Sequence, residues 1–70
     1  MTPSEAVLRV LIDAGEPLHW TVIQDRALRA GYLDPFETPD VRRAVLAALR
    51  EAVGDGRLTK PATGMYALAA

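Results

Sequence analysis

Apolar residues recur at steps of three and four between residues 3 and 14, the spacing of a helix that buries one face. Just before this segment, Thr2 can cap the free backbone amides, and Pro3 fits the first helical position. Glu5 can close a capping box back onto Thr2. Gly15 supplies the stop, because glycine accepts the left-handed conformation in which many helices end. The pattern predicts a first helix over residues 3–14.

A second apolar stripe between Thr21 and Leu28 predicts a short second helix. Thr21 is its expected N-cap, Gln24 is the partner three residues on in a second capping box, and Gly31 ends it. The preceding segment PLHW, residues 17–20, is expected to be extended, with Pro17 keeping the chain out of a helix at its start.

The only histidine and the only tryptophan of the chain, His19 and Trp20, are neighbours in this extended segment. Side chains alternate along a strand, so we expect these two on opposite faces. Trp20 is expected to cover the edge of the core near the second helix, and His19 to form a hydrogen bond at that junction. Thr21 supplies a hydroxyl near His19, but its use as a helix cap leaves no nucleophile and base pair. We therefore expect no enzymatic activity.

Residues 32–38, YLDPFET, connect the second helix to a third. Tyr32, Leu33 and Phe36 are too apolar for a free linker, so we expect them to pack over the edge of the core. The alternative is that these three residues form an exposed apolar patch that contacts another protein.

Residues 39–53 predict the longest amphipathic helix. Its start repeats the chemistry of the first helix, with Thr38 as the cap, Pro39 in the first position and an acid in the first turn. One side of this helix carries apolar residues, with Leu46 at the edge: Val41, Val45, Leu49, Ala52 and Val53. The other side is polar or small: Asp40, Arg43, Ala47, Arg50 and Glu51.

The segment GDG after this helix breaks it, and the residues that follow predict a β-hairpin. The expected strands are residues 57–60 and 65–69, joined by the loop PATG at 61–64. Pro61 cannot donate a ladder hydrogen bond, so it belongs in the loop or at a sheet edge.

Three helices, a short extended link after the first and a terminal hairpin follow the element order of a winged helix-turn-helix. In that arrangement, residues 17–20 would supply a third strand that pairs with the hairpin. We expect a mainly α fold with a small β-hairpin wing, forming a single domain over residues 1–70.

Composition limits the kinds of site that this chain can form. It has no cysteine and one histidine, so we expect no disulfide, no metal site and no cofactor. No apolar stretch reaches the roughly 18 residues of a membrane span, and the N-terminus lacks the basic-then-apolar order of a secretion signal. We expect an intracellular, cytoplasmic protein with no membrane partner.

Charge is distributed unevenly along the chain. The net formal charge of −1 argues against a strongly cationic polymer-binding protein. However, residues 39–64 contain five basic and three acidic residues, whereas residues 1–38 contain three basic and six acidic ones. Since phosphate contacts depend on the local potential, this acidic chain can still present a positive face.

Four segments resemble the HARE-HTH domains, a family of winged helices. They are EAVLRVLIDAGEPLHW at 5–20, ALRAGY at 27–32, TPDVRRAVLAALR at 38–50 and GMYAL at 64–68. HARE-HTH domains occur in chromatin-associated and restriction-endonuclease-linked proteins, and they are relatives of the N-terminal domain of the bacterial RNA polymerase delta subunit. The shared features are the PLH-aromatic segment, the TP that opens the third helix, and the terminal glycine-aromatic-x-leucine.

The chain also departs from the family pattern at two places. Leu58 stands in the first wing strand, where the family commonly has phenylalanine. The connector DPFET replaces a basic, glycine-containing stretch, which removes positive charge from a loop near the expected DNA face.

The resemblance and the local charge together predict a small DNA-binding domain, nucleoid-associated, that acts in transcription regulation or DNA metabolism. The helix over 39–53 would enter the major groove of duplex DNA, with Arg43 and Arg50 toward bases or phosphates and Arg42 toward a phosphate. The wing, residues 57–68, would lie on the phosphate backbone. The expected DNA-binding residues are Thr38 (through its backbone amide), Arg42, Arg43, Arg50, Arg57 and Lys60.

Two alternatives to DNA binding stay open. The arginines could belong to an ordinary solvated helix face that forms surface ion pairs. Winged helices also serve as docking or dimerisation domains, for example on the transcription machinery, so the partner could be another protein or a larger parent chain. The sequence fixes no oligomeric state. Added salt separates the classes, because it weakens DNA binding steeply and leaves an apolar docking surface intact.

Overall fold

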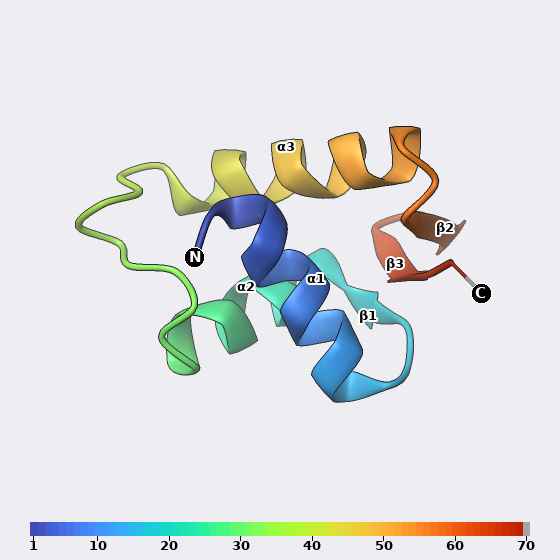
Figure 1. Ribbon diagram of the computed structural model, residues 1–70, viewed down its shortest axis with the longest axis horizontal. Coiled ribbons are helices and arrows are strands. Elements are labelled where there is room, and N and C mark those ends of the chain that lie inside the picture. The colour runs from blue at the N-terminus through green and yellow to red at the C-terminus, as the bar shows by residue number, and fades with distance from the viewer. Residues whose placement is uncertain (70) are drawn as a thin grey trace.

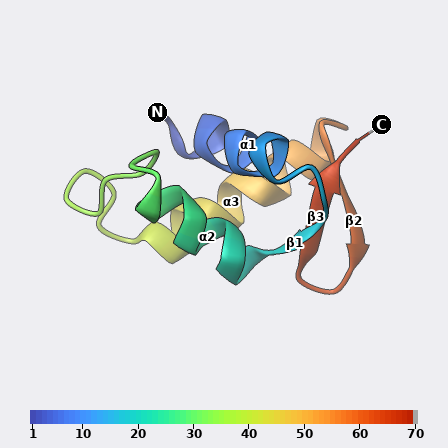
Figure 2. The ribbon, with the colours of Figure 1, turned by 90° about the horizontal axis from the view of Figure 1, so that it is seen from below.

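The computed structural model describes residues 1–69; Ala70, the last residue of the expected domain, lies outside the described residues. Along the chain the elements are α1 (Pro3–Ala14), β1 (Leu18–His19), α2 (Trp20–Arg29), α3 (Val41–Gly54), β2 (Leu58–Ala62) and β3 (Met65–Leu68) (Figure 1). The fold therefore combines three helices with a small three-stranded antiparallel sheet. Figures 1 and 2 show the sheet at one end of the molecule and the connector between α2 and α3 at the other.

The sheet has the strand order β1-β3-β2, which confirms that the extended link after α1 pairs with the hairpin. Leu18 is opposite Tyr66 in the β1–β3 pair, and Thr59 is opposite Ala67 in the β2–β3 pair. The first hairpin strand is longer than predicted, because β2 continues to Ala62 through an irregularity in the register. Pro61 lies in this irregular part of an edge strand, where a residue without an N–H is tolerated.

The predicted bounds and caps of α1 are confirmed. Thr2 Oγ1 accepts the amide hydrogen of Glu5 at 3.2 Å, and the Thr2 hydroxyl donates to the carboxylate of Glu5 at 3.0 Å. At the other end, Gly15 has a φ of 66° and donates its N–H to the carbonyl of Leu11. Local capping chemistry thus fixes both ends of this helix.

The predicted start of α2 at Thr21 is wrong, because the helix begins at Trp20 and His19 is its cap. Nδ1 of His19 accepts the amide hydrogen of Thr21 at 3.2 Å and lies 2.8 Å from the Thr21 hydroxyl. The strand β1 leads directly into the helix. Trp20, the first helical residue, still donates its N–H to the carbonyl of Gly64 in the hairpin at 2.9 Å. Gln24 therefore closes no capping box, and its Oε1 is buried without a hydrogen-bond partner.

Because Trp20 is helical, the two rings do not take opposite faces of a strand, and their centroids lie 5.8 Å apart. The expected roles of the two residues are nevertheless confirmed. Trp20 is half-buried against the core, and His19 forms its hydrogen bonds at the junction of β1 and α2.

The predicted start of α3 is also wrong. The helix begins at Val41, and Asp40 caps it by accepting the amide hydrogen of Arg43 at 3.1 Å. Thr38 does not act as the cap, because the helix starts at Val41 and the carboxylate of Asp40 supplies the acceptor. The N–H of Thr38 donates to the carbonyl of Asp34 at 2.9 Å. Thr38 therefore belongs to the turn that starts at Asp34, ahead of the helix.

The core forms where the three helices pack on one another and on the sheet. The predicted phase of α3 is confirmed, with Val45 and Leu49 buried and Val41 and Val53 half-buried. The largest fully buried side chains are Leu11, Ile23, Leu49, Leu58, Val7 and Val45. Among residues 1–69, none of the helices has both the length and the apolar character needed to cross a bilayer.

The connector between α2 and α3 follows the prediction only in part. Leu33 is buried and Tyr32 is half-buried against the core, where the Tyr32 hydroxyl donates to Asp13 at 2.7 Å. Phe36 was expected to pack as well, but it is 93% exposed. The turn at Asp34, whose carboxylate accepts the N–H of Phe36 at 2.9 Å, places this ring in solvent.

Candidate nucleic-acid interface

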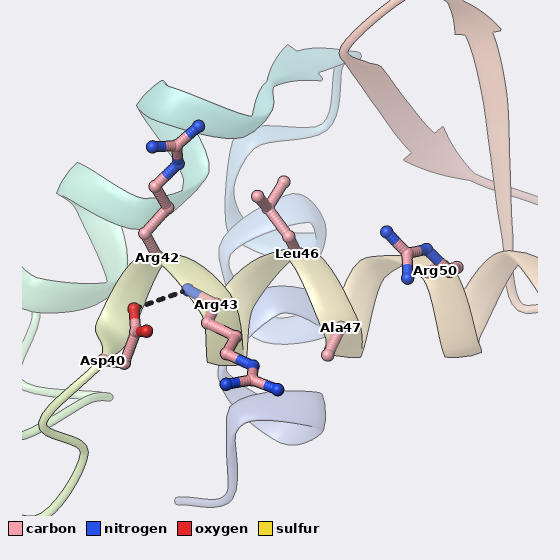
Figure 3. Close-up of a pocket in the computed structure, with 6 residues that line it drawn as sticks. All are labelled: Asp40, Arg42, Arg43, Leu46, Ala47 and Arg50. Carbon is pink, nitrogen blue, oxygen red and sulfur yellow. Dashed lines mark hydrogen bonds between the residues drawn. The ribbon is translucent and has the colours of Figure 1, made fainter.

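The solvent side of α3 presents three arginines on one continuous surface. Arg42, Arg43 and Arg50 are exposed, whereas Val45 and Leu49 on the other side of the same helix are buried. An open depression of about 590 Å³ on this surface is lined by Asp40, Arg42, Arg43, Leu46, Ala47 and Arg50. Figure 3 shows Arg42 reaching toward α2 and Arg43 leaning to the opposite side of α3. The helix phase predicted from the sequence therefore produces a basic face.

Within the described residues, no carboxylate directly neutralises the arginines of this face. Within residues 1–69 the ion pairs are Arg9–Asp13 at 3.3 Å, Arg29–Asp25 at 3.0 Å and Arg57–Asp55 at 2.9 Å. None of these pairs includes an arginine of α3 or Lys60. Asp40, the acid that borders the depression, uses one carboxylate oxygen to cap the helix. The local potential of this face is therefore positive, although the chain is acidic overall.

An aromatic ring supports the first of the three arginines. The guanidinium carbon of Arg42 lies 5.4 Å from the ring centroid of Trp20, within the range of a cation–π contact. Such a contact restricts the side chain and leaves the N–H donors of the guanidinium available to an oxygen ligand. The structure thus gives Arg42 a preferred position at the border between α2 and α3.

The hairpin brings one of its two expected cations to the basic face. Lys60 Nζ lies 5.9 Å from the ring centroid of Tyr66, and Lys60 borders a small depression together with Arg50. Arg57 differs, because its guanidinium donates a hydrogen bond to Asp55 at 2.9 Å within an ion pair. Lys60 therefore adds to the positive face, whereas the charge of Arg57 is locally neutralised.

Thr38 does not belong to this surface in the way that the sequence suggested. Its amide is already bonded to the carbonyl of Asp34, and α3 begins three residues later at Val41. The backbone N–H of Thr38 is therefore not free to donate to a phosphate, and Thr38 is not part of the candidate site.

The aromatic supports, Trp20 and Tyr66, were absent from the predicted site. The Lys60–Tyr66 contact had a partial signal, because the predicted hairpin already places Lys60 within one position of Tyr66. The observed register, with Thr59 opposite Ala67, brings the two residues together. The Arg42–Trp20 contact joins two helices and had no comparable local signal.

Within the part of the chain that the structure describes, no group of three or more histidine, aspartate or glutamate side chains gathers as a metal site. The chemistry available at the candidate interface is therefore the binding of anions by guanidinium and ammonium groups. Comparison of the chain with protein-family models, with curated proteins and with solved structures found no match.

Proposed function

We propose that this protein is a winged-helix domain that binds duplex DNA through the exposed face of α3 and through the β2–β3 hairpin as its wing. The observation that carries this proposal is the row of exposed arginines on α3, which form no ion pair with any carboxylate of residues 1–69. On α1 and α2, by contrast, Arg9 is paired with Asp13 and Arg29 with Asp25.

The dimensions and side chains of α3 suit the major groove. Its 14 residues correspond to a rod about 21 Å long, and the major groove admits one helix. Arg43 and Arg50 are seven residues apart, so they lie on the same side two turns apart, and the small Ala47 between them allows close approach. A guanidinium can bind guanine or a phosphate with two parallel hydrogen bonds. Arg42 would then bind a phosphate beside the groove.

The resemblance to HARE-HTH domains supports the same assignment. It implies a role in transcription regulation or DNA metabolism, and a location at the nucleoid in the cytoplasm. The arrangement of three helices and a terminal three-stranded sheet is compatible with this family's winged-helix fold.

Fluorescence anisotropy with a mixed-sequence duplex, at about 50 mM and about 200 mM salt, tests the proposal. We expect binding that weakens steeply between these salt concentrations and is abolished in the double variant R43A/R50A. The matched control is R26A/R29A, which removes the same charge from α2, where both arginines border a depression shared with α1. Absence of binding by the wild-type protein at tens of micromolar and low salt would contradict the proposal.

Phe36 favours a second candidate function, dimerisation. Its ring is 93% exposed, yet it sits on an ordered turn in which the backbone N–H groups of Glu37 and Thr38 donate to the carbonyl of Asp34. Aromatic residues are enriched at the centres of protein interfaces, so a ring that is already positioned by its turn can serve as an anchor. The acidic neighbours Asp34 and Glu37 favour a recipient pocket that has basic residues at its border.

This chain itself contains a depression of that kind. It has a volume of about 380 Å³ and is lined by Val10, Asp13, Arg26, Arg29, Ala30 and Tyr32. In the second candidate function, Phe36 of one copy would occupy this depression on another copy. Sedimentation equilibrium of the wild type and F36A tests it. A mass that rises with concentration in the wild type alone, at low and high salt, would support dimerisation, and a monomer in both proteins would exclude it.

A further inference from the structure

A small depression between α3 and the hairpin brings together two cations from different elements. Arg50 comes from α3 and Lys60 from β2, and both border a space of about 150 Å³ whose other lining residues are Leu46, Val53 and Tyr66. The break after α3 and the short strand β2 turn the chain back, so residues ten positions apart in the sequence face one site.

Among residues 1–69, neither cation is neutralised by an ion pair, and Lys60 has an aromatic contact. Lys60 lies over the ring of Tyr66, which is buried and belongs to the central strand of the sheet. Two like charges that border one depression repel each other, and an anion placed between them removes that repulsion. The electrostatics of the depression therefore favour an anionic occupant.

The size and lining of the depression narrow the kind of anion. A volume of about 150 Å³ corresponds to about five water molecules, which is too small for a whole nucleotide. Leu46 and Val53 add apolar surface beside the two cations. This combination suits a single phosphate group between the two cations, with the carbons of the adjoining sugar in contact with the apolar residues.

We propose that Arg50 and Lys60 bind the same phosphate group of the DNA backbone, so that α3 and the wing are fixed to the duplex at one shared point. This inference rests on the proposed DNA-binding function and adds a specific geometry to it. If each cation bound its own phosphate, the wing and the helix would instead contact the backbone independently.

The salt dependence of DNA binding distinguishes a shared phosphate from two separate ones. The slope of log K against log[salt] is about −0.9 for each phosphate that the protein neutralises. For a shared phosphate, the R50Q/K60Q double variant should lose about 0.9 of this slope, and each single variant should lose clearly less. The control R43Q/K60Q combines residues that border different depressions, so its loss should equal the sum of the losses of its two single variants. A loss of about 1.8 in R50Q/K60Q would overturn the inference and leave DNA binding intact.

A titration with inorganic phosphate, followed by NMR, separates this inference from the proposed function. We expect phosphate to shift the Arg50 Nε–H signal and the backbone amide signals of Lys60 and Tyr66 in the wild type. In R50Q/K60Q, the backbone amide signals at positions 60 and 66 should stay unshifted. If these signals shift but the protein does not bind DNA, the proposed DNA-binding function is wrong. The phosphate site itself is then real, and its ligand is another phosphorylated molecule. If neither phosphate nor DNA shifts them, the site itself is overturned.

Discussion

A Cβ atom built on Gly64 would lie 2.7 Å from Nε2 of His19, so the hairpin turn closes directly against the residue that caps α2. Gly64 also has a φ of +76° and accepts the N–H of Trp20 through its carbonyl at 2.9 Å. The start of α2 and the turn of the wing are therefore one structural unit, built around the imidazole of His19.

Replacement of Gly64 by alanine should destabilise the protein more than the same replacement at Gly31. Both glycines have a φ of +76°, so both variants carry a strained backbone that costs about 1 kcal/mol. A Cβ at Gly31 meets nothing within 4 Å, whereas at Gly64 it displaces His19 and disturbs the cap, at an added cost of about 1 kcal/mol. Urea unfolding measures both losses. Equal losses of unfolding free energy in the two variants would contradict the close approach of Gly64 to His19.

Substitutions of His19 test its role as the cap of α2. His19→Ala should lower the free energy of unfolding by about 1 kcal/mol, because the amide of Thr21 loses its acceptor. His19→Asn should recover most of this loss, since asparagine is among the best N-cap residues. Urea unfolding gives the stability, and hydrogen exchange of the Thr21 amide reports the bond itself. Equal protection of this amide in both variants would show that the imidazole is not the cap.

The side of α3 that faces the core can be tested at Leu49. Leu49→Ala should cost about 2 to 5 kcal/mol, because the side chain is fully buried in the hydrophobic core. Phe36→Ala removes a larger side chain and should change stability little, since that ring is in solvent. Thermal or urea unfolding compares the two. A near-neutral L49A would mean that the phase of α3 is wrong.

The contact between Arg42 and Trp20 has an optical readout, because Trp20 is the only tryptophan of the chain. Arg42→Ala should change the emission of Trp20 and reduce stability by about 0.5 to 1 kcal/mol. Arg43→Ala removes the same charge one residue along and should leave the emission unchanged. An identical spectrum for wild type and R42A would exclude the cation–π contact.

Local signals predicted α1 and the hairpin, because each depends on neighbours in the sequence. The pairing of the hairpin with the extended link joins distant residues, Leu18 and Tyr66, and was predicted from the order of the elements. The threonine and glycine around α1 supply its caps directly, and proline and glycine mark the hairpin loop.

The starts of α2 and α3 were predicted wrongly because a second group competes with each threonine. At α2, the imidazole of His19 in β1 accepts the amide hydrogen of Thr21 and caps the helix in place of Thr21. At α3, Thr38 belongs to the turn at Asp34, and Asp40 caps the helix instead.

The basic face was predictable to the extent that helical periodicity decides which arginines of α3 are exposed. What surrounds those arginines was not predictable in the same way. The ion pair that neutralises Arg57, the ring beneath Arg42 and the shared depression of Arg50 and Lys60 all depend on the folded chain. Phe36 shows the opposite error, since an apolar residue was assigned to the core although its turn points it into solvent.

A map of backbone amide shifts during titration with mixed-sequence duplex DNA tests the central claim most directly, because it reports binding and the bound face together. The predicted result is a continuous set of perturbed residues that includes Arg42, Arg43, Arg50 and Lys60, with Arg26 on α2 unchanged. An unperturbed spectrum, or shifts confined to the connector around Phe36, would contradict DNA binding through α3 and the wing.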